Sequence, residues 1–201
     1  MTPLILSSIF CFMNKDEFRK TYLARRTALT KSEHEELSQK IADLFFLSVD
    51  LDKIQNLHVF LPIVSKREPN TWIIIERLQK EFPHIRLIIP RVMGEGMENI
   101  FLEGPHQLEK TRWDMVEPMH GLVAAPPEID LVLVPLLVVD MEGHRIGYGK
   151  GYYDRFLKLC RPDCIKTGVS FFDPTAGITE KSDNDVLLNS CLTPGKFHTF
   201  Q

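Results

Sequence analysis

The segment that most restricts the fold of this chain is the apolar run over residues 129–139, which closely spaced glycines follow within a few residues. Almost every residue of the run is branched or aliphatic, which is typical of a strand covered on both faces in a parallel sheet. Strand-like and helix-like patterns alternate along the rest of the chain. This alternation predicts an α/β fold: a single layered domain with a mostly parallel sheet flanked by helices, Rossmann-like in organisation.

Hydrophobic spacing and capping residues predict the individual elements. Asn14 is the expected N-cap of the first helix, with Glu17 completing a capping box, and Ser32 with Glu35 repeats the pattern at the second helix. Helices are expected from residue 14 to about 29, from 32 to about 46, and over 71–81 and 153–159. Strands are expected over 57–62, 85–90, 99–102, 129–139, 165–171 and 186–192. The Pro-, Gly- and His-rich segment 104–127 has no internal assignment.

The length of the chain, 201 residues, suits one sizeable domain. We expect this domain to span residues 13–201 and residues 1–12 to be an extension or a misassigned start, with Met13 as the initiator. Residues 1–12 are apolar, but they are too few to span a bilayer and lack the positive flank and cleavage site of a signal peptide.

The charge and cysteine content exclude several classes of protein. A net charge of -3 argues against a generic nucleic-acid binder, which usually carries a basic excess. The four cysteines form no C-x-x-C pair and no zinc-like cluster with histidine, as expected of a reduced protein. No other segment has the length and apolarity of a membrane helix. We therefore expect a cytoplasmic protein that binds neither nucleic acid nor membranes. We also expect it to be a monomer.

A glycine loop follows the apolar run and carries the strongest functional signal. Gly147, Gly149 and Gly151 alternate with Tyr148 and Lys150 just before a predicted helix. Glycines let the backbone approach phosphate oxygens, and amides at a helix N-terminus favour an anion. With the positive charge that Arg145 and Lys150 add, the segment suits a triphosphate. It matches neither the P-loop nor the G-x-G-x-x-G pattern, so a solvated glycine-rich turn remains an alternative.

The sequence of this loop, G-H-R-I-G-Y-G-K-G-Y-Y-D-R-F-L over residues 143–157, closely resembles the signature of the 5-formyltetrahydrofolate cyclo-ligase family. Shorter matches occur in the family's order along the chain: Lys15 and Arg19, Glu68-x-x-Thr71, Trp113 before Glu117-Pro118, Val134-Pro135 with Asp140, residues 166–169, and Asn184-Asp185 with Thr193. One departure is Leu188-Asn189, which stands where the family pattern has Leu-Asp, so no carboxylate role is assigned there.

The resemblance implies a reaction in which ATP and 5-formyltetrahydrofolate give ADP, phosphate and 5,10-methenyltetrahydrofolate. It implies ATP and a reduced folate as partners, Mg²⁺ as the cofactor, and no enzyme nucleophile. The implied catalytic residues are Arg145 and Lys150. The implied ATP-binding residues are Lys15, Arg19, Arg145, Gly147, Gly149, Lys150 and Gly151; the folate-binding residues are Glu68, Trp113, Tyr152 and Tyr153; the metal ligands are Asp154 and Asp185.

Other interpretations of the same residues stay open at this stage. Lys15 and Arg19 could form a solvated helix face, and each aromatic residue could be part of the core. A kinase or sugar-phosphate enzyme with the same sheet would have no affinity for reduced folates. A non-catalytic nucleotide-sensing module would need the glycine loop but not Glu68, Trp113 or Asp154.

Overall fold

The computed structural model describes residues 13–111 and 115–200. Its α-helices are α2 (Lys15–Thr27), α3 (Lys31–Ser48), α4 (Trp72–Glu81) and α5 (Tyr152–Leu157). Its strands are β1 (Asn56–His58), β2 (Arg86–Met93), β3 (Gly96–Phe101), β4 (Leu108–Lys110), β5 (Val116–Pro118), β6 (Leu131–Pro135), β7 (Val138–Val139), β8 (Arg145–Ile146), β9 (Ile165–Val169), β10 (Ser190–Leu192) and β11 (Phe197–Thr199). Short 3₁₀ turns lie at Leu51–Lys53 (η2), Val64–Lys66 (η3), Pro105–Gln107 (η4) and Pro126–Glu128 (η5).

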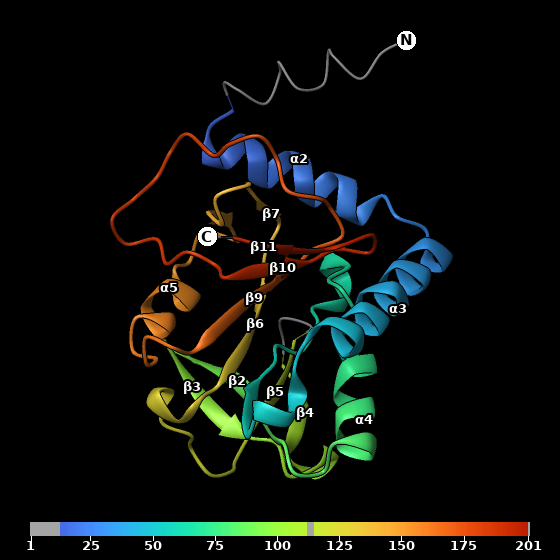
Figure 1. Ribbon diagram of the computed structural model, residues 1–201, viewed down its shortest axis with the longest axis vertical. Helices are drawn as coiled ribbons and strands as arrows, with labels where there is room; N and C mark the ends of the chain where they lie inside the picture. Colours follow the sequence, from blue (N-terminus) through green and yellow to red (C-terminus); the bar gives the residue numbers. More distant parts are fainter. Residues whose placement is uncertain (1–12, 112–114, 201) are drawn as a thin grey trace.

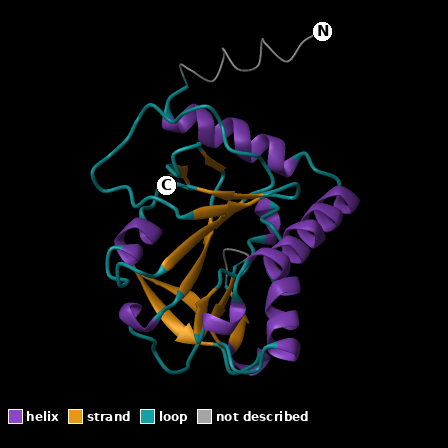
Figure 2. Ribbon diagram, viewed as in Figure 1, coloured by secondary structure: helices purple, strands orange, loops and turns teal. Residues whose placement is uncertain are grey.

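The centre of the molecule is a seven-stranded sheet with the order β11-β10-β9-β6-β1-β2-β3. Neighbouring strands from β10 to β2 run parallel, whereas β11 and β3 pair antiparallel at the two edges. In Figures 1 and 2 the helices α3 and α4 lie on one side of this sheet and α5 on the other. The arrangement confirms the predicted α/β fold with a mostly parallel sheet.

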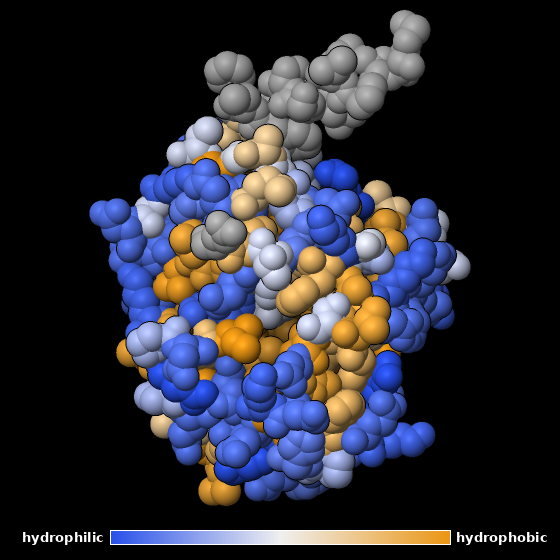
Figure 3. Space-filling view, in the orientation of Figure 1, coloured by the Kyte–Doolittle hydropathy of each residue, from blue (hydrophilic) through white to orange (hydrophobic). Residues whose placement is uncertain are grey.

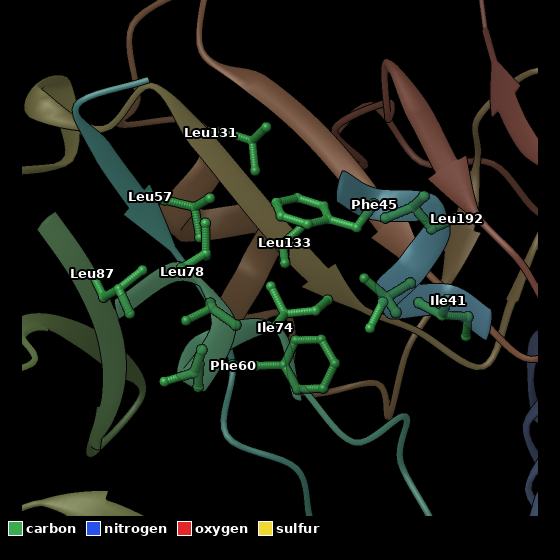
Figure 4. Packing of buried hydrophobic residues seen from close by; sticks show 14 of the residues in the cluster. Ile41, Phe45, Leu57, Phe60, Ile74, Leu78, Leu87, Leu131, Leu133 and Leu192 are labelled. Atoms are coloured by element: carbon green, nitrogen blue, oxygen red, sulfur yellow. The ribbon is translucent and has the colours of Figure 1, made fainter. Parts of the chain in front are cut away.

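Alternate residues of β6 pack on opposite faces of the sheet. Leu131 and Leu133 join the larger hydrophobic cluster, which α3 and α4 cover, and Figure 4 shows this packing. Val132 and Val134 join a second cluster, to which α5 contributes Phe156. The strand is therefore covered on both faces, which explains its continuous apolar sequence. The solvent-facing surface in Figure 3 is mostly hydrophilic, with apolar residues gathered near the middle of the view.

The first helix begins as predicted. The Asn14 side chain accepts hydrogen bonds from the backbone N–H groups of Asp16 and Glu17, and Glu17 accepts one from the Asn14 N–H at 2.8 Å. The second helix begins earlier than predicted, because Thr30 and Glu33 form its capping box in place of Ser32 and Glu35. Both starts are local in origin, since each satisfies N–H groups that the first helical turn leaves without partners.

The predicted strand over residues 129–139 is wrong in its extent, because β6 ends at Pro135. Proline has no N–H to donate to a neighbouring strand, so the chain leaves the sheet there. It continues as β7, which pairs with β8 in a separate hairpin. The Asp140 carboxylate stabilises the turn of this hairpin by accepting the N–H groups of Glu142 and His144, both at 2.9 Å.

Smaller differences lie elsewhere in the chain. Only Ser190–Leu192 of the predicted strand over 186–192 forms β10, and β1 is shorter than the predicted strand over 57–62. The unassigned segment 104–127 contains η4, the β4-β5 hairpin and part of η5. In the described part of the chain, no helix has both the length and the apolar character needed to cross a membrane.

Candidate active site

Three adjacent parallel strands, β6, β1 and β2, end near one another, and a cleft of about 770 Å³ lies at that edge of the sheet. Pro135 at the end of β6, Phe60 and Leu61 after β1, and Val92 near the end of β2 line the cleft. Ligands of open α/β sheets bind beyond the carboxyl ends of the strands, and this cleft lies at such a position.

The described residues that the sequence singled out meet in this one cleft. They are Lys15, Arg19, Glu68, Arg145, Gly147, Gly149, Lys150, Gly151, Tyr152, Tyr153, Asp154 and Asp185. Trp113 lies outside the described residues. The lining residues are thus brought together from segments far apart in the chain, but their individual roles stay predictions.

The helix α2 contributes two cations to the cleft. The Lys15 ammonium lies 2.9 Å from Asp185 Oδ2. One turn further along the helix, Arg19 Nε donates a hydrogen bond to the carbonyl oxygen of Gly147 at 3.2 Å. The helix contacts both β7 and β8, so it lies against the hairpin that leads into the glycine loop. These contacts exclude a purely solvated face for the two side chains.

The Arg145 guanidinium is a fixed and mostly buried cation. Its Nη2 lies 2.7 Å from Asp154 Oδ1, and its side chain is 6% exposed. It also donates a hydrogen bond to the carbonyl of Val186. Burial lowers the pKa of Arg145, and the negative charge of Asp154 opposes that shift. Arginine is by nature the most persistently charged of the basic side chains, and its planar guanidinium suits a close pair with a carboxylate. Arg145 lies on β8 and Asp154 lies in the first turn of α5, so these two elements hold the ion pair in place.

The three glycines of the loop differ in why glycine is needed. Gly149 and Gly151 have φ angles of +86° and +68°, which side chains with a Cβ rarely adopt. Gly147 has no such φ angle, and a Cβ there would have no atom within 4 Å. Neither strain nor packing within the protein therefore requires glycine at position 147, and its place in the cleft lining is consistent with a ligand that approaches the backbone.

The Lys150 side chain is exposed at the edge of the cleft. In the part of the chain that the structure describes, its ammonium has no ion-pair or hydrogen-bond partner, unlike Lys15 and Arg145. The Lys150 ammonium can therefore bind an anionic ligand without losing an existing contact.

Glu68 lies at the buried end of the cleft and is 3% exposed. Its Oε2 accepts the Ile63 N–H at 2.7 Å, and its Oε1 accepts the Tyr148 hydroxyl at 2.6 Å. Burial raises the pKa of Glu68, and the two hydrogen bonds oppose the shift. Tyr148 and its partner Arg26, which donates to the Tyr148 hydroxyl, were not predicted as site residues from the sequence. The only signal for Tyr148 was its place between two glycines.

The two tyrosines at the start of α5 have different surroundings. The Tyr152 hydroxyl donates to the carbonyl oxygen of Gly94 at 3.1 Å, which ties α5 to the turn between β2 and β3. Tyr153 packs against His58, with 6.0 Å between the ring centroids. Its buried hydroxyl has no hydrogen-bond partner among the described residues, and neither has the His58 ring, whose pKa burial lowers to about 3. Both tyrosines line the cleft, but Tyr153 also packs in the core.

The two carboxylates predicted to bind Mg²⁺, Asp154 and Asp185, are both partly occupied. Asp154 uses Oδ1 for Arg145 and for the Val186 N–H, and Asp185 uses Oδ2 for Lys15 and for the Ser182 N–H. Within residues 13–111 and 115–200, no group of three His, Cys, Asp or Glu side chains is placed to hold a metal ion. The second oxygen of each carboxylate is not used in these bonds. This donor set fits a magnesium ion that also takes phosphate and water ligands.

Comparison with known proteins points to one family. The model of the 5-formyltetrahydrofolate cyclo-ligase family matches residues 12–177, so the C-terminal match at Asn184-Asp185 and Thr193 lies beyond it. A 5-formyltetrahydrofolate cyclo-ligase of Mycoplasma genitalium is 27% identical over 161 residues, which are 79% of this chain and 86% of the relative. That of Escherichia coli is 27% identical over 180 residues, 86% of this chain and 96% of the relative.

A solved structure agrees with the sequence relatives. The NMR structure of a 5,10-methenyltetrahydrofolate synthetase from Aquifex aeolicus has a TM-score of 0.81 and 28% identity to this chain, and the match covers 94% of each chain. The extent of the family match and the likeness of the whole fold agree with the signature in the glycine loop. The chain therefore belongs to the 5-formyltetrahydrofolate cyclo-ligase family of enzymes.

Proposed function

We propose that this protein converts 5-formyltetrahydrofolate to 5,10-methenyltetrahydrofolate while ATP is converted to ADP and phosphate. The family supports the folate conversion. The observation that carries the use of ATP is the meeting of cations from two distant segments, Lys15 and Arg19 from α2 and Arg145 and Lys150 from the glycine loop, in one cleft. Such a cluster suits the charge of a triphosphate.

The chemical difficulty is that the oxygen of a formamide leaves poorly. In the proposed reaction the formyl oxygen attacks the γ-phosphorus, the bond to the β-phosphate oxygen breaks, and ADP leaves. The aniline nitrogen of the folate then attacks the activated formyl carbon, loses its proton, and phosphate departs. Both nucleophiles belong to the substrate, so the protein supplies position and charge and needs no nucleophile of its own.

The cations of the cleft have distinct tasks in this reaction. Lys15 and Arg19 hold the phosphates from the side of α2, and Gly147 lets the backbone approach them. Arg145 and Lys150 neutralise the negative charge on the phosphoryl group in transit. Arg145 is already oriented by Asp154, so little reorganisation is needed when the substrate binds.

Magnesium fits the same end of the cleft. Bound with the nucleotide, it would supply further positive charge beside the phosphate oxygens. Asp154 and Asp185 are the residues that would hold it. Because each of them also orients a cation of the site, a change at either carboxylate would affect the placement of that cation as well.

The apolar part of the cleft lining suits a folate. Phe60, Leu61, Val92 and Met97 give it an apolar surface for aromatic rings. Tyr152, Tyr153 and Trp113 are the proposed stacking residues, and Glu68 is the proposed partner of the N–H groups of the pterin. A sugar phosphate would leave this apolar wall without a function, which favours the folate over the rival kinase or sugar-phosphate reading.

The direct test mixes the protein with ATP, Mg²⁺ and 5-formyltetrahydrofolate and follows the near-ultraviolet absorbance of the methenyl product. We expect product to form only when all three are present, with one ADP released for each methenyl group. Replacement of ATP by an analogue that cannot transfer its γ-phosphoryl group is the matched control. Product formed at an equal rate without ATP would contradict the proposed phosphorylation, and no product under any condition would contradict the function.

A further inference from the structure

Tyr148 connects the glycine loop to the buried end of the cleft. It lies between Gly147 and Gly149, and its hydroxyl donates to Glu68 Oε1 at 2.6 Å while accepting a hydrogen bond from Arg26 Nη2. The three linked side chains come from α2, from the segment after η3 and from the glycine loop. These are three separate segments of the wall of the cleft, and one hydroxyl joins them.

The charges at the two ends of this link are both buried. Arg26 is 2% exposed and Glu68 is 3% exposed. Among the described residues, no direct ion pair joins Arg26 to Glu68. The Tyr148 hydroxyl lies between them, accepting a hydrogen bond from Arg26 and donating one to Glu68. An ionised group without partners in a buried position is strongly disfavoured. The Tyr148 hydroxyl therefore satisfies the cation and the carboxylate at once.

The partners of the link are themselves held in place. The Arg26 guanidinium donates to the carbonyl oxygens of Lys66 at 2.9 Å and Leu136 at 3.3 Å. The Lys66 ammonium lies 3.9 Å from the centroid of the Tyr148 ring, a cation–π contact. With the ring and the guanidinium both fixed, the hydroxyl can present its hydrogen in few directions, and Glu68 receives it.

Resting on the proposed folate activity, we infer that Tyr148 is a positioning residue: its hydroxyl, held by Arg26, orients the Glu68 carboxylate for the folate. Tyr148 contacts the reacting atoms of neither substrate in this role. In the proposed function the phosphates meet the backbone and the cations of the loop, whereas the hydroxyl is directed to Glu68. Loss of the hydroxyl alone must then weaken the folate side and spare the nucleotide side.

The charged and titratable groups around Glu68 set the sign of a second effect. They are Arg26 from α2, Lys66 from η3, Tyr148 from the glycine loop and Tyr153 from α5, with His34 of α3 bonded to the Glu68 carbonyl oxygen. Burial raises the pKa of Glu68, and the Ile63 N–H, the Tyr148 hydroxyl and the charges of Arg26 and Lys66 lower it. Removal of the hydroxyl must raise this pKa further.

The first test is Tyr148→Phe, which keeps the ring and removes one oxygen. We expect the KM for 5-formyltetrahydrofolate to rise about tenfold, the loss of one hydrogen bond to a charged group, while the KM for ATP changes less than about twofold. The acidic limb of the pH profile of kcat/KM for the folate should move to higher pH. An equal rise of both KM values, or an unchanged folate KM, would overturn the inference.

The matched control is Tyr22→Phe. Tyr22 is 3% exposed and its hydroxyl bonds to Thr175 and Arg25, but it does not line the cleft. Its loss should lower the melting temperature by an amount similar to that of Tyr148→Phe and leave both KM values unchanged. A folate KM raised equally in both variants would mean that Tyr148 acts only through stability.

A double-mutant cycle with Glu68→Gln tests whether Tyr148 acts through the carboxylate. If it does, Tyr148→Phe adds less than about a twofold increase in folate KM once Glu68 is already Gln. If the double mutant instead showed the product of the two single increases in folate KM, Tyr148 would not act through Glu68. The wild-type protein in the same assay distinguishes failure of this inference from failure of the proposed function. If the wild type turns over but the two effects multiply, only the role of Tyr148 is rejected. If the wild type does not turn over, the proposed function is rejected.

A second variant keeps the test open if Tyr148→Phe does not fold. Incorporation of 3-fluorotyrosine at position 148 retains the hydroxyl and makes it a stronger hydrogen-bond donor. The pKa of Glu68 should then fall, and the acidic limb for the folate should move to lower pH, opposite to the shift in Tyr148→Phe. An unmoved limb in this variant would overturn the inference.

Discussion

Two carboxylates on the wall of the same cleft have pKa values shifted in opposite directions. Asp185 and Glu68 each accept one backbone N–H and one side-chain donor. The donor to Asp185 is the Lys15 ammonium, and the Asp185 side chain is 21% exposed. The donor to Glu68 is a neutral phenol, and Glu68 is 3% exposed. Burial would raise both pKa values, but at Asp185 the hydrogen bonds from Lys15 and Ser182 and the charges of Lys15 and Arg145 together outweigh it, so its pKa is lowered.

The difference indicates that the two ends of the cleft suit different parts of the ligands. At its open end, where Lys150 is exposed and Lys15, Asp185, Arg145 and Asp154 also lie, cations either contact a carboxylate directly or, like Lys150, have no partner in the described part of the chain. At its buried end, which Tyr148 and Glu68 line, the Tyr148 hydroxyl lies between Glu68 and the buried Arg26, and burial is the main cause of the raised pKa of Glu68. The open end suits phosphates, and the buried end suits a ligand recognised by hydrogen bonds and apolar contact.

The largest effect is expected at the open end, from Lys150→Ala. The ammonium has no partner in the described part of the chain, so its loss should leave the melting temperature unchanged. The rate constant kcat should fall about 10²- to 10³-fold, as when one stabilising donor is removed from a transition state. Lys80→Ala, an exposed lysine of α4 outside the cleft, is the control in the same turnover assay. Unchanged turnover of Lys150→Ala at saturating ATP would remove Lys150 from the catalytic residues.

The next largest effect is expected at the buried end, from Glu68→Gln. The change should raise the folate KM about tenfold or more and spare the KM for ATP, because a charged acceptor is lost on one wall only. The pKa of Glu68 is raised in the folded protein, so its ionisation destabilises the fold as pH rises above its unfolded value near 4.3. Thermal melts from pH 4 to 8 should therefore favour Glu68→Gln increasingly with pH. A constant difference across that range would contradict the raised pKa.

The glycine loop offers a comparison between two neighbouring positions. Gly149→Ala should destabilise the protein by about 1–2 kcal/mol, because φ is +86° and a Cβ would lie 3.0 Å from the Arg19 guanidinium carbon. Gly147→Ala should leave stability unchanged and weaken nucleotide binding, because its Cβ would enter the open cleft. Thermal melts and calorimetric titration with an ATP analogue measure the two effects. Equal nucleotide affinity for Gly147→Ala and the wild type would contradict a close backbone approach.

The smallest effect is expected from Asp185→Asn. The pair with Lys15 is partly exposed, so its loss should cost less than about 1 kcal/mol of unfolding free energy at pH 7. The lowered pKa of Asp185 gives the opposite sign to Glu68: this stabilisation is present above the unfolded value near 3.9 and is lost as pH falls toward the folded pKa. Denaturant unfolding at pH 7 and pH 3 should show the difference shrinking. A larger difference at pH 3 would show that the ion pair is not its cause.

Much of the fold could be predicted because its determinants are local. The Asn14–Glu17 capping box and the order of strand, glycine loop and helix are contained in short segments. The wrong strand predictions came from applying such local rules without the neighbouring segments of the fold. Pro135 ended the long apolar strand because the chain there leaves the ladder of hydrogen bonds, and residues 186–189 form no strand although their sequence allowed one. Tertiary context decides such cases, since strand propensity depends on what the strand packs against.

By itself, the sequence determined the α/β class, the family and the set of polar residues that could serve a phosphate or a folate. Only the tertiary structure decided which of these residues touch. Tyr148 meets Glu68 across 80 residues of chain, and Lys15 meets Asp185 across 170. The same fold decided that Asp185 has a lowered pKa and Glu68 a raised one. The physical reason is that a carboxylate responds to its burial and to the charge of its nearest donor, and both depend on segments distant in the sequence.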